Sequence, residues 1–327
     1  MSVLVTGSAG HLGEALVRRI RALGQTAVGV DRKPSPFTDQ VGSIGERLFV
    51  ENCVRQADCV VHAATLHKPH VVTHGWQDFI DTNVTGTLNL LEAAVSGGVT
   101  SFVFISSTST FGSAINRDSP AAAVWVTEEV TPKPNNIYGV TKLMAENLCE
   151  LVHRKRRLAL VVLRTSRFFP EEDDVPEMRR EYETANLQAN ELLYRRVDLE
   201  DAVSAVLLAL QKAPEIGFGR YIISATTPFT HADLTPLAED APAVVRARFP
   251  ECEALFRARG WKLLPRIDRV YVNDRARAEL GWNPRCDFEY LLDCLRANRD
   301  FRSPLAREVG CKGYHGRSFS EGPYPVE

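Results

Sequence analysis

The 327-residue sequence lacks the features that mark several specialised classes of protein. Its 7 cysteines are an odd number and form no Cys-x-x-Cys pair, which argues against a disulfide framework and a structural zinc site. The formal net charge is only −2, so nothing predicts binding to nucleic acid. No apolar run is long enough to span a membrane, and the N-terminus leads directly into a predicted strand without a signal peptide. We therefore expect a cytoplasmic protein.

What the sequence does contain is an alternation of short apolar strands and amphipathic helices. Strands are predicted at 3–5, 27–30, 58–64, 101–106 and 158–163, and helices at 11–23, 79–97 and 136–153. This order predicts an α/β fold with a doubly wound parallel (Rossmann) sheet. The pattern then loosens, with a helix at 199–210 and a strand at 220–224, which predicts a smaller C-terminal α/β lobe. We expect a dinucleotide-binding domain at 1–165, a substrate lobe at 166–302 interleaved with it, and an extended tail at 303–327.

A glycine-rich turn follows the first predicted strand. Gly7 permits the tight turn, Gly10 lets a pyrophosphate approach the backbone, and Gly13 lets the next helix pack closely on the strand. The amides at the start of that helix favour a phosphate. The second predicted strand ends in Asp31, at the spacing expected for a carboxylate that binds a ribose. Strand, turn, helix, strand and acid together predict a dinucleotide site.

Asp31 bears on which nicotinamide cofactor is used. A carboxylate there accepts hydrogen bonds from the ribose hydroxyls of NAD and repels the additional phosphate of NADP. Arg32 and Lys33 follow directly and provide cations that suit that phosphate, although both are also typical solvated surface residues. We therefore favour NAD, with NADP as the alternative.

Tyr138 and Lys142 lie four residues apart in a predicted helix, which places both side chains on one face. The pKa of a free tyrosine is about 10, so it is a weak base at neutral pH. A neighbouring ammonium and an oxidised nicotinamide would stabilise the phenolate and lower that pKa. The phenolate would take a proton from a substrate hydroxyl while the carbon gives its hydride to the cofactor. Ser107, at the end of a predicted strand, would hold the same oxygen.

These motifs resemble the extended short-chain dehydrogenase/reductases of the NAD-dependent epimerase/dehydratase group. The residues that carry the resemblance are the glycine turn at 6–13, Val-His-Ala-Ala at 61–64, the run at 83–94, Ser-Ser-Thr at 106–108 and Tyr-Gly-Val-Thr-Lys at 138–142. Weaker matches lie at 199–203 and 279–284. The resemblance implies that Ser107, Tyr138 and Lys142 form a catalytic triad.

The resemblance also implies further site residues. Those expected at the cofactor are Gly7, Gly10, His11, Leu12, Gly13, Asp31, Arg32, Ser43, Ile44, Ala63, Ala64, Asn83, Tyr138 and Lys142. Those expected at the substrate are His67, Thr108, Ser109, Ser166 and Arg167. It further implies a homodimer through the helices at 79–97 and 136–153. No metal is expected, although His62, His67, His70 and His74 also permit a metal, a solvated loop or a substrate contact.

Departures from the family pattern affect the substrate. Nucleotide-sugar members usually carry Asn-Val-Tyr-Gly-Pro where this chain has Ser-Arg-Phe-Phe-Pro at 166–170, and an arginine where it has Tyr194, beside Arg195 and Arg196. Ser43 stands where an acid is common near the adenine. The intervening segment is short, and the compact lobe is similar to that of uronate dehydrogenases. The acidic run at 171–174 is expected to be a solvated loop, and the tail either folds over the cleft or is disordered.

Three functions follow from these observations. The first is an NAD-dependent oxidoreductase that acts on a secondary hydroxyl or keto group of a sugar or sugar acid. The alternative is an NAD-dependent nucleotide-sugar epimerase or dehydratase, which uses the same triad and returns the hydride to the substrate. A more distant alternative is a non-catalytic NAD-binding sensor, against which an intact triad argues. In each case the ligand is a small molecule.

Overall fold

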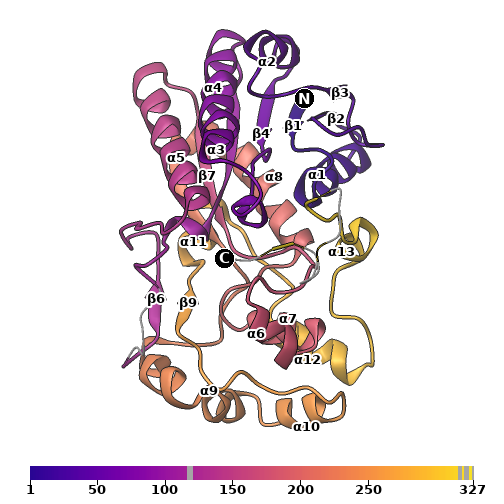
Figure 1. The fold of residues 1–327 in the computed structure, drawn as a ribbon, viewed down its shortest axis with the longest axis vertical. Coiled ribbons are helices and arrows are strands. Elements are labelled where there is room, and N and C mark those ends of the chain that lie inside the picture. Colours follow the sequence, from indigo (N-terminus) through magenta and orange to yellow (C-terminus); the bar gives the residue numbers. More distant parts are fainter. Residues whose placement is uncertain (116–120, 316–318, 320–323, 326–327) are drawn as a thin grey trace.

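The fold is organised around one parallel sheet, and the computed structural model describes residues 1–115, 121–315, 319, 324 and 325 of the chain (Figure 1). The seven strands, in their order across the sheet, are β3 (Gln40–Val41), β2 (Thr26–Asp31), β1 (Ser2–Thr6), β4 (Cys59–His62), β5 (Ser101–Ser107), β7 (Leu160–Thr165) and β8 (Phe218–Ile223). Every neighbouring pair is parallel. The predicted doubly wound sheet is confirmed, and the strand order reverses beside β1, where such folds bind their ligands.

Helices cover both faces of this sheet because its strands are apolar on both sides. On one face Val3 and Val5 of β1 pack with α1 (His11–Ala22) and α8 (Leu199–Ile216). On the other face Leu4 packs with α2 (Arg47–Val54), α4 (Gly86–Ser96) and α5 (Ile137–Arg156). Successive residues of a strand point to opposite faces, so Val3 and Val5 pack in the core on one face and Leu4 packs in the core on the other. No helix in the described part of the chain has the length and apolar character that a membrane span needs.

The predicted helix at 79–97 is interrupted in the structure. It consists of α3 (Trp76–Phe79), a π-helical segment η2 (Ile80–Thr85) and α4. Such π segments are rare and are frequent at functional sites. Here the segment carries Asn83 into the interior beside the loop that follows β4. Apolar periodicity does not report such an extra residue in a turn, so the sequence predicted one continuous helix.

A second lobe lies below the carboxyl ends of the strands (Figure 1). Its helices are α6 (Pro176–Glu181), α7 (Thr184–Glu191), α9 (Leu234–Arg248), α10 (Cys252–Arg257) and α12 (Phe288–Arg296). A two-stranded parallel sheet of β6 (Val124–Val126) and β9 (Arg269–Tyr271) completes it. The chain interleaves the two parts: β6 comes from the first half of the sequence, whereas α8, β8 and α11 (Asp274–Leu280) return to the sheet.

The sequence predicted an extended C-terminal segment, but the segment is not extended throughout. It begins with a short helix, α13 (Pro304–Val309), which packs beside α1 (Figure 1). Ser303 caps this helix by accepting a hydrogen bond from the amide of Ala306, and Pro304 occupies the first helical position, which suits its fixed φ. Part of the predicted tail, including 316–318 and 320–323, lies outside the described residues.

Candidate active site

The glycine turn after β1 has the geometry of a phosphate cradle. Gly7 has a φ of +75°, which favours glycine, and a Cβ at Gly13 would lie 1.9 Å from the carbonyl oxygen of Gly7. At Gly10, a Cβ would lie 3.2 Å from the same oxygen. No side chain caps the start of α1, so its first amides remain available to an anion. These observations fit the pyrophosphate of a dinucleotide.

The cleft above this turn has a volume of about 570 Å³. Of the fourteen residues expected at the cofactor, twelve line it: Gly7, Gly10, His11, Leu12, Gly13, Asp31, Arg32, Ser43, Ile44, Ala63, Ala64 and Tyr138. The carboxylate of Asp31 is oriented by the amides of Ala9 and Lys33, at 3.1 and 2.9 Å. The residues present therefore fit NAD along the whole cleft, from a ribose carboxylate to Tyr138.

Asn83 and Lys142 are the two expected residues that do not line the cleft. The side-chain oxygen of Asn83 accepts hydrogen bonds from Thr65 and the amide of Leu66, and its nitrogen donates to the Leu66 carbonyl and to Thr141. An amide can make about four hydrogen bonds, so none remains for a cofactor. Asn83 therefore positions the loop that follows β4, and it ties this loop to α5.

The three residues expected to be catalytic converge at the end of β5. Ser107 is the last residue of β5, and Tyr138 lies in the first turn of α5. This turn packs closely on the β5 loop, because a Cβ at Gly139 would lie 2.6 Å from the Ser109 carbonyl oxygen. One turn further along, the ammonium of Lys142 lies 4.2 Å from the centre of the Phe104 ring and is buried.

The sequence predicts that Lys142 and an oxidised nicotinamide together lower the pKa of Tyr138, and the protein groups alone do not lower it. Burial raises the pKa of Tyr138 to about 12, although its neighbour Ser107 acts in the opposite direction. Burial also lowers the pKa of Lys142 to about 7, although Glu146 and Cys149 oppose this. Near neutral pH the Lys142 amine is therefore partly uncharged and stabilises a phenolate less. Ionisation of Tyr138 then needs positive charge from elsewhere in the site.

A buried ion pair supports the catalytic helix from below, and the sequence analysis did not identify it. Glu146 is completely buried one turn after Lys142 and pairs with Arg164 of β7 at 2.8 Å. It also accepts a hydrogen bond from Ser106 of β5 at 2.5 Å. Glu146 thus connects α5 to the two strands whose ends form the site. An interior glutamate in an otherwise amphipathic helix was the signal that could have found it.

A second cavity of about 440 Å³ adjoins the cofactor cleft. It contains Ser107 and all five residues expected at the substrate: His67, Thr108, Ser109, Ser166 and Arg167. The two cavities share one wall, which consists of His67, Thr165, Phe168 and Phe169. Tyr138 lines one side of this wall and Ser107 the other, so a molecule in the second cavity can lie against both the triad and the cofactor.

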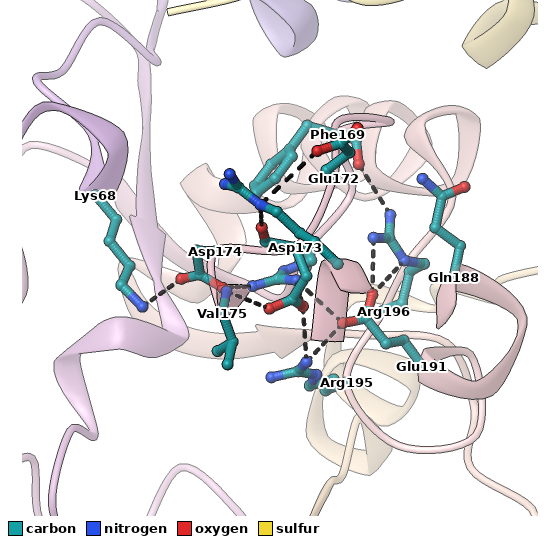
Figure 2. Close-up of polar contacts among 12 residues, drawn as sticks. Lys68, Phe169, Glu172, Asp173, Asp174, Val175, Gln188, Glu191, Arg195 and Arg196 are labelled. Atoms are coloured by element: carbon teal, nitrogen blue, oxygen red, sulfur yellow. Dashed lines mark hydrogen bonds and ion pairs between the residues drawn. The ribbon is translucent and has the colours of Figure 1, made fainter. Parts of the chain in front are cut away.

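The far side of this cavity contains a network of buried charges (Figure 2). Glu191 of α7 is fully buried and pairs with Arg167, Arg195 and Arg196 at 3.2, 2.7 and 2.7 Å. Burial raises the pKa of Glu191, but the three guanidinium groups outweigh this and hold it at about 2. Arg195 also lines the cavity. It is the sequence neighbour of Tyr194, the position at which the family pattern has an arginine.

Half of the run at 171–174, expected to be a solvated loop, belongs to this network, whereas Glu172 is exposed and Glu171 pairs with His11. Asp173 pairs with Arg167 and Arg195, and Asp174 pairs with Arg167 and with Lys68 (Figure 2). Burial raises the pKa of Asp174, but Arg167 and Lys68 hold it well below its usual range. A sequence does not show which carboxylates have distant cations as partners, so an acidic run looks solvated.

The histidines that follow β4 have different positions. His62 is buried between the hydroxyls of Thr6 and Thr87, at 2.9 Å from each, and is structural. The ring of His67 is tilted by 42° against that of Tyr138, with ring centres 4.8 Å apart, and its Nδ1 is buried without a hydrogen-bond partner. Burial lowers the pKa of His67 to about 3, so its ring is neutral. His70 and His74 line the cofactor cleft.

Several residues that line the two cavities were not among the predicted ones. In the substrate cavity they include Asn135, Arg269, Tyr271 and Tyr324, and in the cofactor cleft Lys312, Gly313 and Tyr314. All come from the second lobe, the C-terminal segment or the loop before α5. No local motif marks them, because they reach the site only through the tertiary fold.

Comparison with known proteins agrees with this geometry. The pattern of the NAD dependent epimerase/dehydratase family matches residues 3–223. The chain is 29% identical over 355 residues to dTDP-glucose 4,6-dehydratase of Streptomyces antibioticus, and the match covers 94% of this chain and 96% of that protein. It is 34% identical over 164 residues to UDP-glucose 4-epimerase 4 of Oryza sativa subsp. japonica, which covers 50% of this chain and 41% of that one.

The fold is also shared with solved structures. A short-chain dehydrogenase/reductase superfamily protein from Agrobacterium tumefaciens, solved with bound NAD, matches with a TM-score of 0.64 and 24% identity. The match covers 94% of this chain and 99% of that one, and at this identity it shows the fold alone. The relatives named above are a dehydratase and an epimerase, so they favour the second of the three functions expected from the sequence. The chain is an NAD-dependent enzyme and belongs to the NAD-dependent epimerase/dehydratase family.

Proposed function

We propose that the chain is an NAD-dependent epimerase that inverts a secondary carbinol of a nucleotide-activated sugar. The observation that supports this most is the shared wall between the two cavities, with Tyr138 on the cofactor side and Ser107 on the substrate side. A sugar hydroxyl held between these two residues lies beside the cofactor cleft. Both relatives named above act, by their names, on sugars or nucleotide-sugars, which supports the substrate class.

Each residue has a separate task in this proposal. Ser107 donates a hydrogen bond to the substrate oxygen, and Tyr138 removes its proton and later returns one. NAD, when bound, would take up the hydride and return it to the other face of the keto sugar, and its positive charge would favour a phenolate at Tyr138. Lys142 lies one turn further along the same helix, and Glu146 fixes this helix to β5 and β7. Tyr138 is buried, which limits the access of water to the atom proposed to transfer the proton.

The cavity favours epimerisation over dehydration. Dehydration needs one group that removes a proton from carbon and another that protonates the departing hydroxyl. Among the described residues that line the substrate cavity, Asp174 is the only carboxylate, and it is held by Arg167 and Lys68. Epimerisation needs only the hydroxyl proton and the hydride. It also needs room for the keto sugar to turn its other face, which a cavity of about 440 Å³ offers.

A charged substituent on the sugar agrees with the cations of this cavity. Among the described residues, four cations line the cavity, Lys68, Arg167, Arg195 and Arg269, together with one carboxylate, Asp174. Asp173, Glu191 and Asp268 pair with three of these cations from outside the lining, and Glu191 is shared with Arg196, so these five cations face four carboxylates. A diphosphate or carboxylate is favoured by this balance.

A second candidate function is the net oxidation of a free sugar or sugar acid to produce NADH. The observation in its favour is that Arg167 and Arg196 are already paired with buried carboxylates (Figure 2), which leaves less positive charge for a diphosphate. A sugar acid with a single carboxylate carries less negative charge than a diphosphate, so it needs fewer free cations in the cavity. This was the first function expected from the sequence.

One assay separates the candidates. The protein is mixed with NAD and either UDP-glucose, dTDP-glucose, or a panel of free sugars and uronic acids. Products are identified by NMR, and NADH is followed by its absorbance. An isomerised nucleotide-sugar without net NADH supports the epimerase. NADH that forms in proportion to an oxidised free sugar acid would overturn it in favour of the second candidate.

We also propose a homodimer formed through α4 and α5. Leu88 of α4 and Val140, Met144 and Leu151 of α5 are large apolar side chains that are 36–42% exposed on these helices. An apolar surface of this kind is typical of a partner interface. Light scattering of the purified protein tests it: a monomer would contradict the proposal.

A further inference from the structure

The C-terminal segment 311–315, here called the strap, lies along the cofactor cleft. The backbone amides of Lys312 and Gly313 each lie 3.3 Å from Oε1 of Glu171. The same oxygen lies 2.8 Å from Nε2 of His11, which belongs to the glycine turn. Burial raises the pKa of Glu171, but the hydrogen bond and charge of His11, together with backbone hydrogen bonds that include the one from Gly313, lower it below its usual value. The strap is therefore bound to the phosphate end of the cleft by a buried carboxylate.

Tyr314 extends the strap towards the catalytic residues. Its ring is stacked on His67, with centres 5.6 Å apart and planes 12° apart, and it also lies near Phe169 at 5.8 Å. His67 in turn contacts Tyr138. Burial raises the pKa of Tyr314 well above its usual value, so its phenol stays neutral. An aromatic wall thus runs from the strap to the proposed base.

The strap is fastened on both sides of the cleft. On the α1 side, the ammonium of Lys312 pairs with Glu14. On the opposite side, His315 hydrogen-bonds the carbonyl of Pro69 at 3.0 Å, and His70 hydrogen-bonds the carbonyl of Tyr314 at 3.3 Å. A segment attached on both sides must detach on one side before a ligand beneath it can leave.

The strap does not fill the space beneath it. With the strap in place, the cleft keeps a volume of about 570 Å³, and Lys312, Gly313 and Tyr314 form part of its lining. Ligand sites have volumes of about 300–1,000 Å³. The strap is therefore a wall of the cofactor site rather than a plug.

We propose that the strap is part of the NAD site, with Tyr314 as a cofactor-binding residue, and that it slows the exchange of NAD with solvent. An epimerase recovers oxidised NAD at the end of each cycle, whereas a net dehydrogenase must release NADH. Slow exchange is thus compatible with rapid turnover in the first case only. In this respect the inference rests on the proposed function, and it names the structural device that retains the cofactor.

The test measures NAD exchange without substrate. Protein loaded with radiolabelled NAD is chased with excess unlabelled NAD, and retained label is followed with time. Tyr314→Ala and a chain that ends at Gly310 are each expected to exchange NAD at least about tenfold faster than the natural chain, because a buried aromatic contact or the whole wall is lost. Tyr314→Phe, which retains the ring, is expected to restore slow exchange.

A matched control removes a tyrosine ring far from the cleft. Tyr290 of α12 is partly exposed in the second lobe, so Tyr290→Ala is expected to exchange NAD at the natural rate. Thermal unfolding of each variant shows that it is folded. Unchanged exchange in folded Tyr314→Ala and in the shortened chain would overturn the inference. Since this assay contains no sugar, its failure is distinct from a failure to epimerise, which the product assay reports separately.

Discussion

The cofactor half and the substrate half of this site are built in different ways. The cradle for NAD arises within one strand, one turn and one helix, between residues 2 and 22. The substrate cavity is held by pairs that are distant in sequence, such as Lys68 with Asp174 and Arg167 with Glu191. A contiguous motif keeps its geometry wherever the fold recurs, whereas a set of distant pairs changes with each loop. The family can therefore keep one cofactor and change its substrates.

The largest expected effect concerns the residue at the boundary of the two halves. Tyr138→Phe removes the group proposed to transfer the proton but keeps the buried ring, so turnover is expected to fall by about 10²- to 10⁴-fold. NAD binding is expected to persist, because the cradle lies on other elements. Product formation under saturating substrate, together with NAD titration, provides the measurement.

The matched control for Tyr138→Phe is Tyr182→Phe, a change at another buried tyrosine, in the second lobe. Turnover by the control should be close to that of the natural chain. Near-normal turnover by Tyr138→Phe would show that the chemistry does not depend on the proposed triad.

The next effect is on stability and lies in the substrate half. Glu191→Gln leaves Arg167, Arg195 and Arg196 without their shared, fully buried carboxylate. Removal of one partner from a buried pair costs about 3–5 kcal/mol. Because the folded-state pKa of Glu191 is lowered to about 2, its contribution is present above the ordinary glutamate pKa and is lost only as the pH falls towards about 2.

Denaturant unfolding at neutral pH measures the free energy of unfolding of Glu191→Gln. The control is Glu253→Gln, whose carboxylate pairs with Arg257 on an exposed helix face and should contribute little. Equal stability of the two variants would mean that the arginine network is not what holds the cavity together.

A smaller effect is expected from the cofactor half. Asp31→Asn removes the charge that opposes the additional phosphate of NADP, while Arg32 and Lys33 remain exposed beside it. The ratio of NADP to NAD affinity is expected to rise by about tenfold, which corresponds to about 1.4 kcal/mol. Binding titrations with both cofactors measure the ratio. A ratio that does not change would remove Asp31 from cofactor selection.

The sequence predicted the cofactor half in detail because each of its signals is local. Glycines at 7, 10 and 13 and an acid at 31 specify a turn and a strand end without reference to the rest of the chain. Asn83 was misplaced because its role depends on a π-helical turn that shifts it into the interior. A tail folded over the cleft was one of the two alternatives that the sequence left open, but Tyr314 was not identified, because it meets His11 only after the chain has folded and nothing near it in sequence marks the contact.

The smallest expected effect links the two halves through pH. His70 faces His67, His74, His315 and Tyr314, and its Nε2 hydrogen-bonds the strap. Burial, with His74 and His315, lowers the pKa of His70 to about 4, against about 6.5 in an open state exposed to water. The open state therefore binds more protons between these values, so closure weakens as the pH falls from about 6.5 to about 4 and is independent of pH above that window.

NAD exchange by the natural chain should consequently be several-fold faster at about pH 5 than at about pH 7.5. The chain that ends at Gly310 has no strap to release, so its exchange rate should depend much less on pH. A parallel rise in both chains would place the titrating group in the cradle instead of in the contacts of the strap. The release of NAD would then be controlled by the cofactor half alone. The local cradle and the substrate cavity, which distant residues hold together, would differ more clearly than they do if the strap controls release.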